Sequence, residues 1–374
     1  RFRINNGAVE YQNRFLRSDT YESNLRANRI VVSEFGTHAY PDPCKSIWQR
    51  FQSWFSTSTP MTDNDNVNIY PVRDQLYAAT ETNFIRRIDG DNLETHEKVD
   101  LSKYLTINMA TAHPHVDPDG TVYNMGSSFG RNGKYHLIKI PNSENPFDNM
   151  SIVCSIPMAR PLYPAYYHSF AITDNHYVFI EQPLVMSVPT LAMSKVTGST
   201  FADALTWKPE YMATPGANLV TLGYTEASAT LGADKSSVEL KYEAMTEPGP
   251  GVGELPRINY TLNGKKYRYF YSITQTNDFK TNLMKFDTKT KSSVIWAEES
   301  AICSEPVFVE NPGVDYSDPN NEDNGVILSS VLSDLDETEG FLLVLDAKTF
   351  KELGRARFRT KSSITATFHG LFVS

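Results

Sequence analysis

The chain has 374 residues, a formal net charge of −9 and a sequence pI near 5.5. Its length allows one to three domains, and its 40% hydrophobic and 21% charged residues exclude a disordered chain. The acidic balance excludes a basic nucleic-acid footprint, and no apolar run approaches the roughly 18 residues of a transmembrane helix. The sequence begins at Arg1 without a signal-peptide pattern, so we expect a truncated start.

The first predicted element is an amphipathic helix over residues 46–55, directly after a Pro-Asp-Pro-Cys-Lys segment. Its apolar residues recur at the spacing of one helical face. Such a helix either packs on a sheet or lies in a membrane interface, where Trp and Phe beside Lys45 and Arg50 suit the headgroup boundary. A cysteine at its start is a candidate for palmitoylation. The candidate membrane-contacting residues are Cys44, Ile47, Trp48, Phe51, Trp54 and Phe55.

A strand, an Asp-led turn and a second strand recur three times along the chain. The turns begin at Asp89, Asp287 and Asp346, whose side chains are suited to accept hydrogen bonds from amides two residues on. Asp119-Gly120 and Asn324-Gly325 are two further hairpin signals. The flanking strands are predicted at 84–88, 93–95, 282–286, 293–296, 341–345 and 356–358.

Repeated hairpins and an excess of aromatic residues, with 20 Phe and 20 Tyr, predict an all-β chain. Two architectures fit: a β-propeller, with blades of about 40–45 residues and four strands, or a large sandwich. The three cysteines, Cys44, Cys154 and Cys303, lie far apart and form no CxxC pair. This favours a reducing compartment, which we expect to be the cytoplasm, and argues against a cysteine zinc site.

Three of the eight histidines stand out by their neighbours: His113, His168 and His369. Each lies among small or aromatic residues, where a charged imidazolium is costly and a neutral imidazole bound to a metal is not. Ligands far apart in sequence are natural in a propeller, where each blade presents its innermost strand to one axis. The spacing alone leaves open that these are ordinary polar residues.

Ordered motifs along the whole chain resemble those of the carotenoid cleavage oxygenases, in their animal branch. They include Ala-Thr-Ala-His-Pro-His around His113, Tyr-His-Ser-Phe around His168 and Phe-His-Gly around His369. The resemblance covers about residues 1 to 374. The matching stretches are 34–37, 41–45, 79–84, 110–115, 167–170, 179–183, 254–260, 304–309, 345–348 and 368–370.

The resemblance implies one seven-bladed β-propeller domain over residues 1–374, with a helical and loop cap over an axial, non-haem Fe(II). Four histidines are expected to hold this ion, and three glutamates to accept hydrogen bonds from the ligand imidazoles. Neutral imidazoles suit Fe(II), and nearby carboxylates offset its charge and fix each ring's tautomer. The matching ligands are His113, His168 and His369, and the matching glutamates are Glu81, Glu254 and Glu305.

The implied reaction is cleavage of a carotenoid double bond by molecular oxygen to retinal-type aldehydes. Within the family, the sequences of the motifs are most similar to those of insect carotenoid isomerooxygenases, which isomerise one product half to the 11-cis form used in vision. Phe35 and Thr80 match positions that line the substrate cavity. Because such substrates dissolve in membranes, the resemblance also favours the membrane-interface interpretation of residues 44–55, and hence a peripherally membrane-associated enzyme.

The sequence departs from the family pattern at one junction. The fourth ligand should follow Tyr-His-Ser-Phe in an aromatic-His-x-Ile-Asn stretch, which is missing. The chain follows the family's order of motifs up to Tyr211. From Met212 its sequence resembles a part of the family pattern that lies far downstream. On the order of 100 residues, about two blades, are absent at this point. Either the protein itself lacks this segment, or only the sequence as written lacks it and the protein keeps four ligands. If the deletion is real, the ring of blades is broken, and we expect weak iron binding and no carotenoid turnover from the chain as written.

Two alternative functions remain open. A retinoid isomerohydrolase acting on retinyl esters has the same ligands, so the motifs do not separate it from a dioxygenase. A carotenoid- or retinoid-binding propeller that has lost its metal and its catalysis is favoured by the missing histidine.

Overall fold

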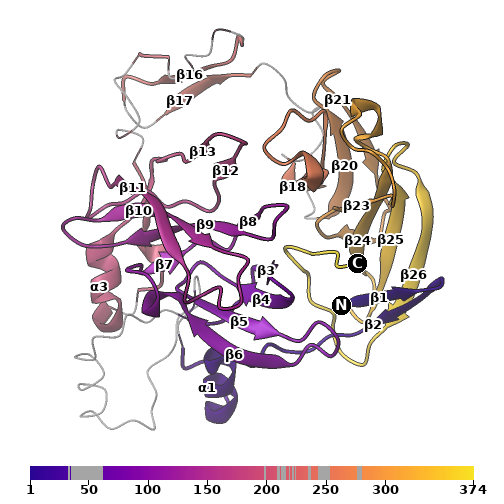
Figure 1. Cartoon of the computed structure of the whole chain (residues 1–374), viewed down its shortest axis with the longest axis horizontal. Coiled ribbons are helices and arrows are strands. Elements are labelled where there is room, and N and C mark those ends of the chain that lie inside the picture. Colours follow the sequence, from indigo (N-terminus) through magenta and orange to yellow (C-terminus); the bar gives the residue numbers. More distant parts are fainter. Residues whose placement is uncertain are drawn as a thin grey trace. The chain divides into compact units, whose positions relative to one another are not determined.

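The computed structural model describes residues 1–32, 34, 62–197, 199–208, 211, 216–218, 220, 223, 225–234, 237–242, 253–275 and 280–374. These residues form two compact units (Figure 1). The larger unit contains residues 14–170 and 178–241, and the smaller unit contains residues 1–13, 171–177 and 242–374. The predicted helix over 46–55 lies outside the described residues.

Two antiparallel sheets dominate the larger unit. The first has the strand order β3-β4-β5-β6, and the second has the order β11-β10-β9-β7 with β8 also paired to β9. The bounds are β3 Asn68–Val72, β4 Gln75–Ala79, β5 Phe84–Ile88, β6 Thr95–Asp100, β7 Met109–Ala110, β8 His115–Val116, β9 Val122–Ser128, β10 Lys134–Ile140 and β11 Ser151–Pro157.

Smaller elements complete the larger unit. Two-stranded sheets pair β14 with β15 and β16 with β17. The bounds are α1 Asp19–Ala27, β14 Leu184–Met186, α3 Val188–Thr197, β15 Leu205–Trp207, β16 Ser228–Leu231 and β17 Val238–Lys241, with short 3-10 turns at Leu101–Lys103 and Ala202–Ala204.

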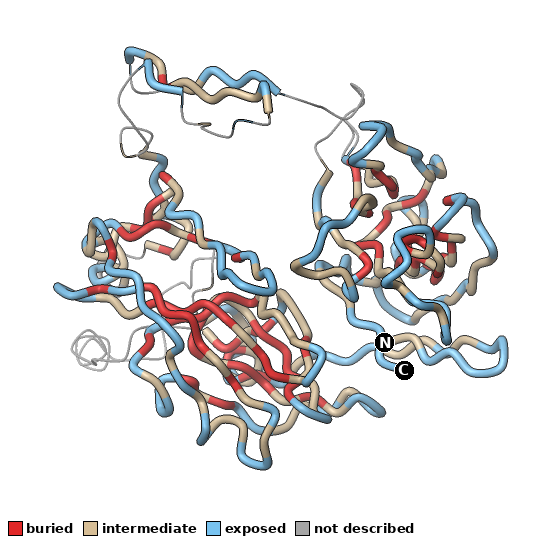
Figure 2. The backbone as a smooth tube through the Cα atoms, turned by 45° about the horizontal axis from the view of Figure 1, so that its top comes forward, coloured by how far each residue is buried: buried red, intermediate tan, exposed pale blue. Residues whose placement is uncertain are grey.

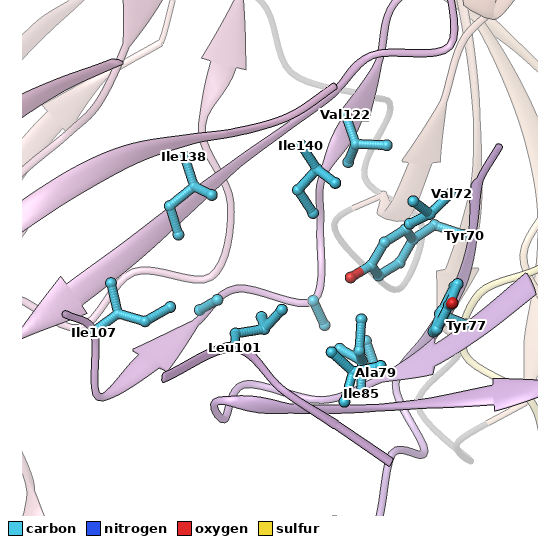
Figure 3. Packing of buried hydrophobic residues seen from close by; sticks show 13 residues of the cluster. Tyr70, Val72, Tyr77, Ala79, Ile85, Leu101, Ile107, Val122, Ile138 and Ile140 are labelled. Carbon is cyan, nitrogen blue, oxygen red and sulfur yellow. The ribbon is translucent and has the colours of Figure 1, made fainter. Parts of the chain in front are cut away.

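The core of the larger unit lies between its two main sheets. Tyr70 and Val72 of β3 belong to the same buried cluster as Ile138 and Ile140 of β10 and Val122 of β9 (Figure 3). Alternate residues of a strand face one side of a sheet, so the apolar positions of both sheets meet in this layer. Burial of this layer removes apolar surface from water and holds the loops that follow β4 and β7 in place.

The smaller unit holds two sheets of the same kind. One has the order β18-β19-β20-β21, and the other has the order β22-β24-β25-β26 with β23 also paired to β24. The bounds are β1 Phe2–Asn5, β2 Ala8–Tyr11, β12 Ala171–Ile172, β18 Glu254–Arg257, β19 Tyr269–Gln275, β20 Thr281–Asp287, β21 Ser292–Trp296, β22 Ala301–Cys303, β23 Val307–Glu310, β24 Gly325–Ser333, β25 Glu339–Asp346 and β26 Glu352–Arg359, with 3-10 turns at Tyr260–Leu262 and Pro319–Asn321. Strand β13, Tyr177–Val178, pairs with β12, and its second residue belongs to the larger unit.

A buried ion pair joins the two main sheets of the smaller unit. Lys285 of β20 lies 2.6 Å from Asp323 and donates to the carbonyl oxygens of Ala347 and Lys348 at 2.8 and 3.1 Å. The side chains of Lys285 and Asp323 are 7% and 9% exposed. Three acceptors satisfy the ammonium, which is the condition under which a buried charge is tolerated.

Figure 2 shows the buried residues gathered along the sheets of each unit.

The three Asp-led turns predicted from the sequence are confirmed. Asp89 accepts hydrogen bonds from the amides of Asp91 and Asn92 at 2.7 and 2.9 Å, between β5 and β6. Asp287 and Asp346 accept amide hydrogen bonds in the same way between β20 and β21 and between β25 and β26. Each carboxylate satisfies turn amides that would otherwise need water.

One predicted hairpin is wrong. Asn324-Gly325 does not form a tight turn, because β23 ends at Glu310 and pairs with β24, which begins at Gly325, across a connection of residues 311–324. Gly325 is required for a different reason: a Cβ there would lie 2.4 Å from the carbonyl oxygen of Val309. The glycine permits the close approach of two strands, and the sequence signal for both situations is the same.

Helix α1 is anchored to the first sheet through Asp63. This carboxylate accepts hydrogen bonds from the amides of Asp19 and Thr20 at 2.9 and 3.1 Å and from Arg86 Nη2 at 2.5 Å. Burial opposes the charge, but these donors outweigh it and lower the pKa of Asp63. Asp65 has no such support: it is 4% exposed and neither carboxyl oxygen has a hydrogen-bond partner among the described residues.

Candidate metal centre

The imidazole of His168 is held by Glu81. His168 lies in the segment between β11 and β12. Its Nδ1 donates to Glu81 Oε1, while Tyr166 Oη donates to Glu81 Oε2 at 2.6 Å. The Glu81 side chain is 11% exposed and the His168 side chain 52%. The hydrogen bond that His168 donates to Glu81 raises the pKa of His168, although burial acts in the opposite direction. This arrangement fixes the neutral ring as the Nδ1–H tautomer, which leaves Nε2 as an acceptor.

His113 meets His168 in the larger unit. It lies between β7 and β8, and its Nε2 is 2.7 Å from Nε2 of His168, with ring centroids 4.2 Å apart. Without a cation, one of these nitrogens carries a proton and donates it to the other, and a bound cation would take the place of that proton. Cis ligands about 2.1 Å from a transition metal lie roughly 3 Å from each other, so the separation fits a shared ion. The pair is therefore a suitable half of a metal site.

The smaller unit carries the matching third imidazole. His369 Nδ1 donates to Glu305 Oε1 at 2.8 Å, and the amide of Gly370 donates to Glu305 Oε2 at 2.8 Å. Glu305 is 3% exposed, and Arg257 lies 3.9 Å from it. As in His168, a carboxylate accepts the hydrogen bond of Nδ1–H, which directs Nε2 away from the carboxylate. Two units thus repeat one chemical device.

The other site residues predicted from the sequence have different surroundings. Glu254 begins β18, is exposed, and its side chain has no hydrogen-bond or ion-pair partner among the described residues. Thr80 directly follows β4 and is half-buried beside Glu81. Phe35 and the candidate membrane residues lie outside the described residues, namely Cys44, Ile47, Trp48, Phe51, Trp54 and Phe55.

Sequence reasoning missed two residues of this site. Tyr166 supports Glu81 from one side, and the hydroxyl of Thr111 contacts the backbone of both His113 and His168. Both residues lie inside or next to the motifs that identified the histidines, so proximity to a motif was the available sequence signal. Nothing in a one-dimensional motif distinguishes the hydroxyl that binds a carboxylate from one that fills space.

Comparison with known families decides the relationship. The family model described as retinal pigment epithelial membrane protein matches residues 1–216 and 224–374. The chain belongs to this family, the animal carotenoid cleavage oxygenases. A carotenoid-cleaving dioxygenase, mitochondrial, of Macaca fascicularis is 36% identical over 474 residues, covering 100% of this chain and 84% of the relative. A beta,beta-carotene 15,15′-dioxygenase of Gallus gallus is 37% identical over 468 residues, covering 100% of this chain and 87% of the relative.

Solved structures of carotenoid oxygenases have the same fold. A cobalt-substituted apocarotenoid oxygenase of Synechocystis matches with a TM-score of 0.71 at 18% identity, covering 100% of this chain and 86% of that one. A chimera of this oxygenase with the retinal pigment epithelial protein matches at 0.70 and 17% identity, covering 98% and 85%. The expected all-β propeller class is confirmed, and the sandwich alternative is wrong. The described residues contain four sheets of four or five strands, where seven blades were expected.

No helix among the described residues is long and apolar enough to cross a membrane.

Proposed function

We propose that this carotenoid oxygenase chain derives from an Fe(II)-dependent dioxygenase that cleaves a polyene double bond of a carotenoid. The observation that carries the proposal is the repeated pair of a histidine and a buried carboxylate, Glu81 with His168 and Glu305 with His369. The relatives named above as carotenoid-cleaving and beta,beta-carotene dioxygenases support the substrate class. The cobalt-substituted structure supports a divalent transition metal.

His113, His168 and His369 would hold the ion through Nε2. Bound Fe(II) would supply the activation of molecular oxygen that the cleavage to two aldehydes requires. The chain's own contribution is to aim the imidazoles, because Glu81 and Glu305 each accept a hydrogen bond from an Nδ1–H group and so direct Nε2 towards the ion. Their charges also offset part of the charge of an ion held by neutral ligands.

The proposal requires the two units to come together so that His369 joins the other histidines. It also requires a fourth ligand. The alignment with the macaque relative spans 474 positions against the 374 residues of this chain, so 100 positions have no counterpart here. The family match breaks between residues 216 and 224, close to the junction at Tyr211 and Met212.

The unpartnered carboxylate of Glu254 also favours a missing segment. The resemblance gives each such glutamate an imidazole to support, and Glu254 has none among the described residues. We therefore propose that a segment of about two blades, bearing the fourth histidine, belongs between Tyr211 and Met212. Without it, a carotenoid- or retinoid-binding chain with weak iron affinity is the second candidate.

The proposal extends to the place of action. A carotenoid substrate dissolves in membranes, so we propose that residues 44–55 attach the protein peripherally to a membrane surface in the cytoplasm. Replacing Trp48, Phe51 and Trp54 by Ser should abolish co-sedimentation with phosphatidylcholine vesicles. Unchanged co-sedimentation would count against this attachment.

Iron content and product analysis test the proposed function. The chain is purified with Fe(II), the bound iron is measured by elemental analysis, and β-carotene or a retinyl ester is supplied with oxygen. We expect substoichiometric iron and no turnover from the chain as written. Insertion of the relatives' segment after Tyr211 should give one iron per chain and aldehyde products from carotenoid. Full-length protein that forms retinol from the ester, or that binds no iron, would contradict the dioxygenase assignment.

A further inference from the structure

Thr111 lies in the segment between β7 and β8, two residues before His113. Thr111 is 3% exposed, and its backbone is hydrogen-bonded to two residues of β9. Its amide donates to the carbonyl of Met125 at 2.9 Å, and its carbonyl accepts from Asn124 Nδ2 at 2.8 Å. Because both backbone groups are satisfied by one ordered strand, the hydroxyl has a defined position.

The hydroxyl of Thr111 connects the two histidine-bearing segments. It accepts a hydrogen bond from the amide of His113 at 3.1 Å, and it donates to the carbonyl oxygen of His168, which is 57 positions away in the sequence. A hydroxyl has one donor and two acceptor lone pairs, so the donor given to His168 leaves a lone pair for His113. One oxygen atom thus sets the spacing of two backbones.

The spacing of the backbones matters because the rings carry the function. The Nε2 atoms are 2.7 Å apart, and a metal ligand set tolerates errors of only about 0.2 Å in its distances. Glu81 orients the ring of His168, but it does not contact His113 among the interactions described. A separate device is needed to fix the distance between the segments, and the Thr111 hydroxyl is placed to do so.

We propose that Thr111 is a positioning residue that presets the separation of His113 and His168 for one metal ion. The inference rests on the proposed metal function for its metal readout, and on the hydrogen bonds alone for a second readout. The methyl group of Thr111 is not part of the device. Removal of the hydroxyl releases both contacts at once, and retention of the hydroxyl without the methyl preserves them.

Three single variants of the full chain separate these contributions. Thr111→Val has nearly the same shape but no hydroxyl, and Thr111→Ser keeps the hydroxyl. Thr121→Val is the matched control, because Thr121 is similarly buried, at 4% exposed, and its hydroxyl binds Asp119 at 3.0 Å and neither histidine segment among the described residues. Each protein is titrated with Co²⁺, followed by its visible absorption. Without metal, the ring nitrogens of His113 and His168 are compared by ¹⁵N chemical shifts, together with amide exchange of His113.

We expect Thr111→Val to weaken Co²⁺ binding by about 10–100-fold, to shift both ring signals and to speed exchange of the His113 amide by at least about tenfold. Thr111→Ser and Thr121→Val should stay within about twofold of the parent chain for Co²⁺. Parent-like Co²⁺ affinity in Thr111→Val would overturn the inference. If neither the parent chain nor the chain carrying the relatives' segment after Tyr211 binds Co²⁺, the proposed metal function fails. The metal-free spectra then decide the positioning role: unchanged ring shifts in Thr111→Val would overturn it, and shifted ones would support it.

Discussion

Tyr166 Oη donates a hydrogen bond to Glu81 Oε2 at 2.6 Å, on the oxygen that His168 does not use. The carboxylate is therefore held at both ends. Burial first and the neighbouring charge of Glu81 second raise the pKa of Tyr166, so the phenol stays protonated and remains a donor. Tyr166 thus helps to orient His168 indirectly, by holding the carboxylate of Glu81 that the imidazole binds.

Tyr166→Phe should loosen this arrangement. Loss of the phenol leaves a nearly buried carboxylate oxygen without its donor, which costs about 1–3 kcal/mol, and the released Glu81 should weaken Co²⁺ binding roughly tenfold. Calorimetric melting and Co²⁺ titration measure the two effects. Tyr167→Phe is the control, because the Tyr167 hydroxyl binds Ser127 at 2.9 Å and does not bind Glu81. An equal loss of Co²⁺ affinity in both variants would refute the specific role of Tyr166.

Glu305→Gln should impair the histidine in the smaller unit. Glu305 accepts from both His369 and Gly370, and a glutamine has only one acceptor oxygen for these two donors. The loss of negative charge also removes compensation for a bound cation. We expect the affinity for Co²⁺ to fall about 10–100-fold. Glu310→Gln, at the exposed end of β23, removes the same charge without touching His369 and should bind Co²⁺ as the parent does.

Asp65 should make the stability of the larger unit depend on pH. Burial and the charge of Asp63 raise its pKa from 3.8 to about 9, while Arg86 and Lys98 act in the opposite direction. The unfolded chain loses this proton near pH 4 and the folded chain retains it, so the free energy of unfolding falls as pH rises from about 4 towards 9. The slope for one proton is about 1.4 kcal/mol per pH unit.

Asp65→Asn removes this titration. The difference in stability between the Asn variant and the parent should therefore grow in favour of the variant from pH 5 to pH 8, measured by urea unfolding. Asp74→Asn, in the exposed turn between β3 and β4, is the control and should leave the pH dependence unchanged. Parallel stability curves for Asp65→Asn and the parent would show that Asp65 is ionised in the folded chain.

The ion pair of Lys285 and Asp323 should show strong coupling. Asp323→Ala leaves a buried ammonium with two carbonyl oxygens and the Tyr269 ring, 4.1 Å away, but no counter-charge. We expect a loss of about 3–5 kcal/mol in unfolding free energy. Replacement of both residues, Lys285→Met with Asp323→Leu, should cost less than Asp323→Ala alone, because no charge remains buried. Chemical denaturation of the single and double variants measures this. Additive losses would mean that the two side chains do not depend on each other.

The sequence predicted those parts of the fold that depend on local chemistry. The Asp-led turns at 89, 287 and 346 form because a carboxylate and the amides it binds are neighbours in the chain. The hairpin predicted at Asn324-Gly325 is wrong because Gly325 is needed for close approach to the backbone of Val309, a residue distant in sequence.

The candidate site was predicted only in part, for the same reason. The ligand histidines carry motifs, whereas Tyr166 and Thr111 act through partners that only the fold brings near. The residue type in a motif is the same whether its hydroxyl forms a hydrogen bond or only packs against neighbours. The geometry of the pair, with its 2.7 Å separation, required the structure.

The turn carboxylates also bear on how the protein ages. An Asp before Gly is a common place for spontaneous isomerisation of the backbone, because the small glycine lets its amide nitrogen attack the side-chain carbonyl. Asp89 and Asp119 both precede glycines, but each is held outward by amides further along the turn, those of Asp91 and Thr121 at 2.7 and 2.8 Å. We expect both positions to resist isoaspartate formation during long storage while the hairpins stay folded, and to become vulnerable once they open.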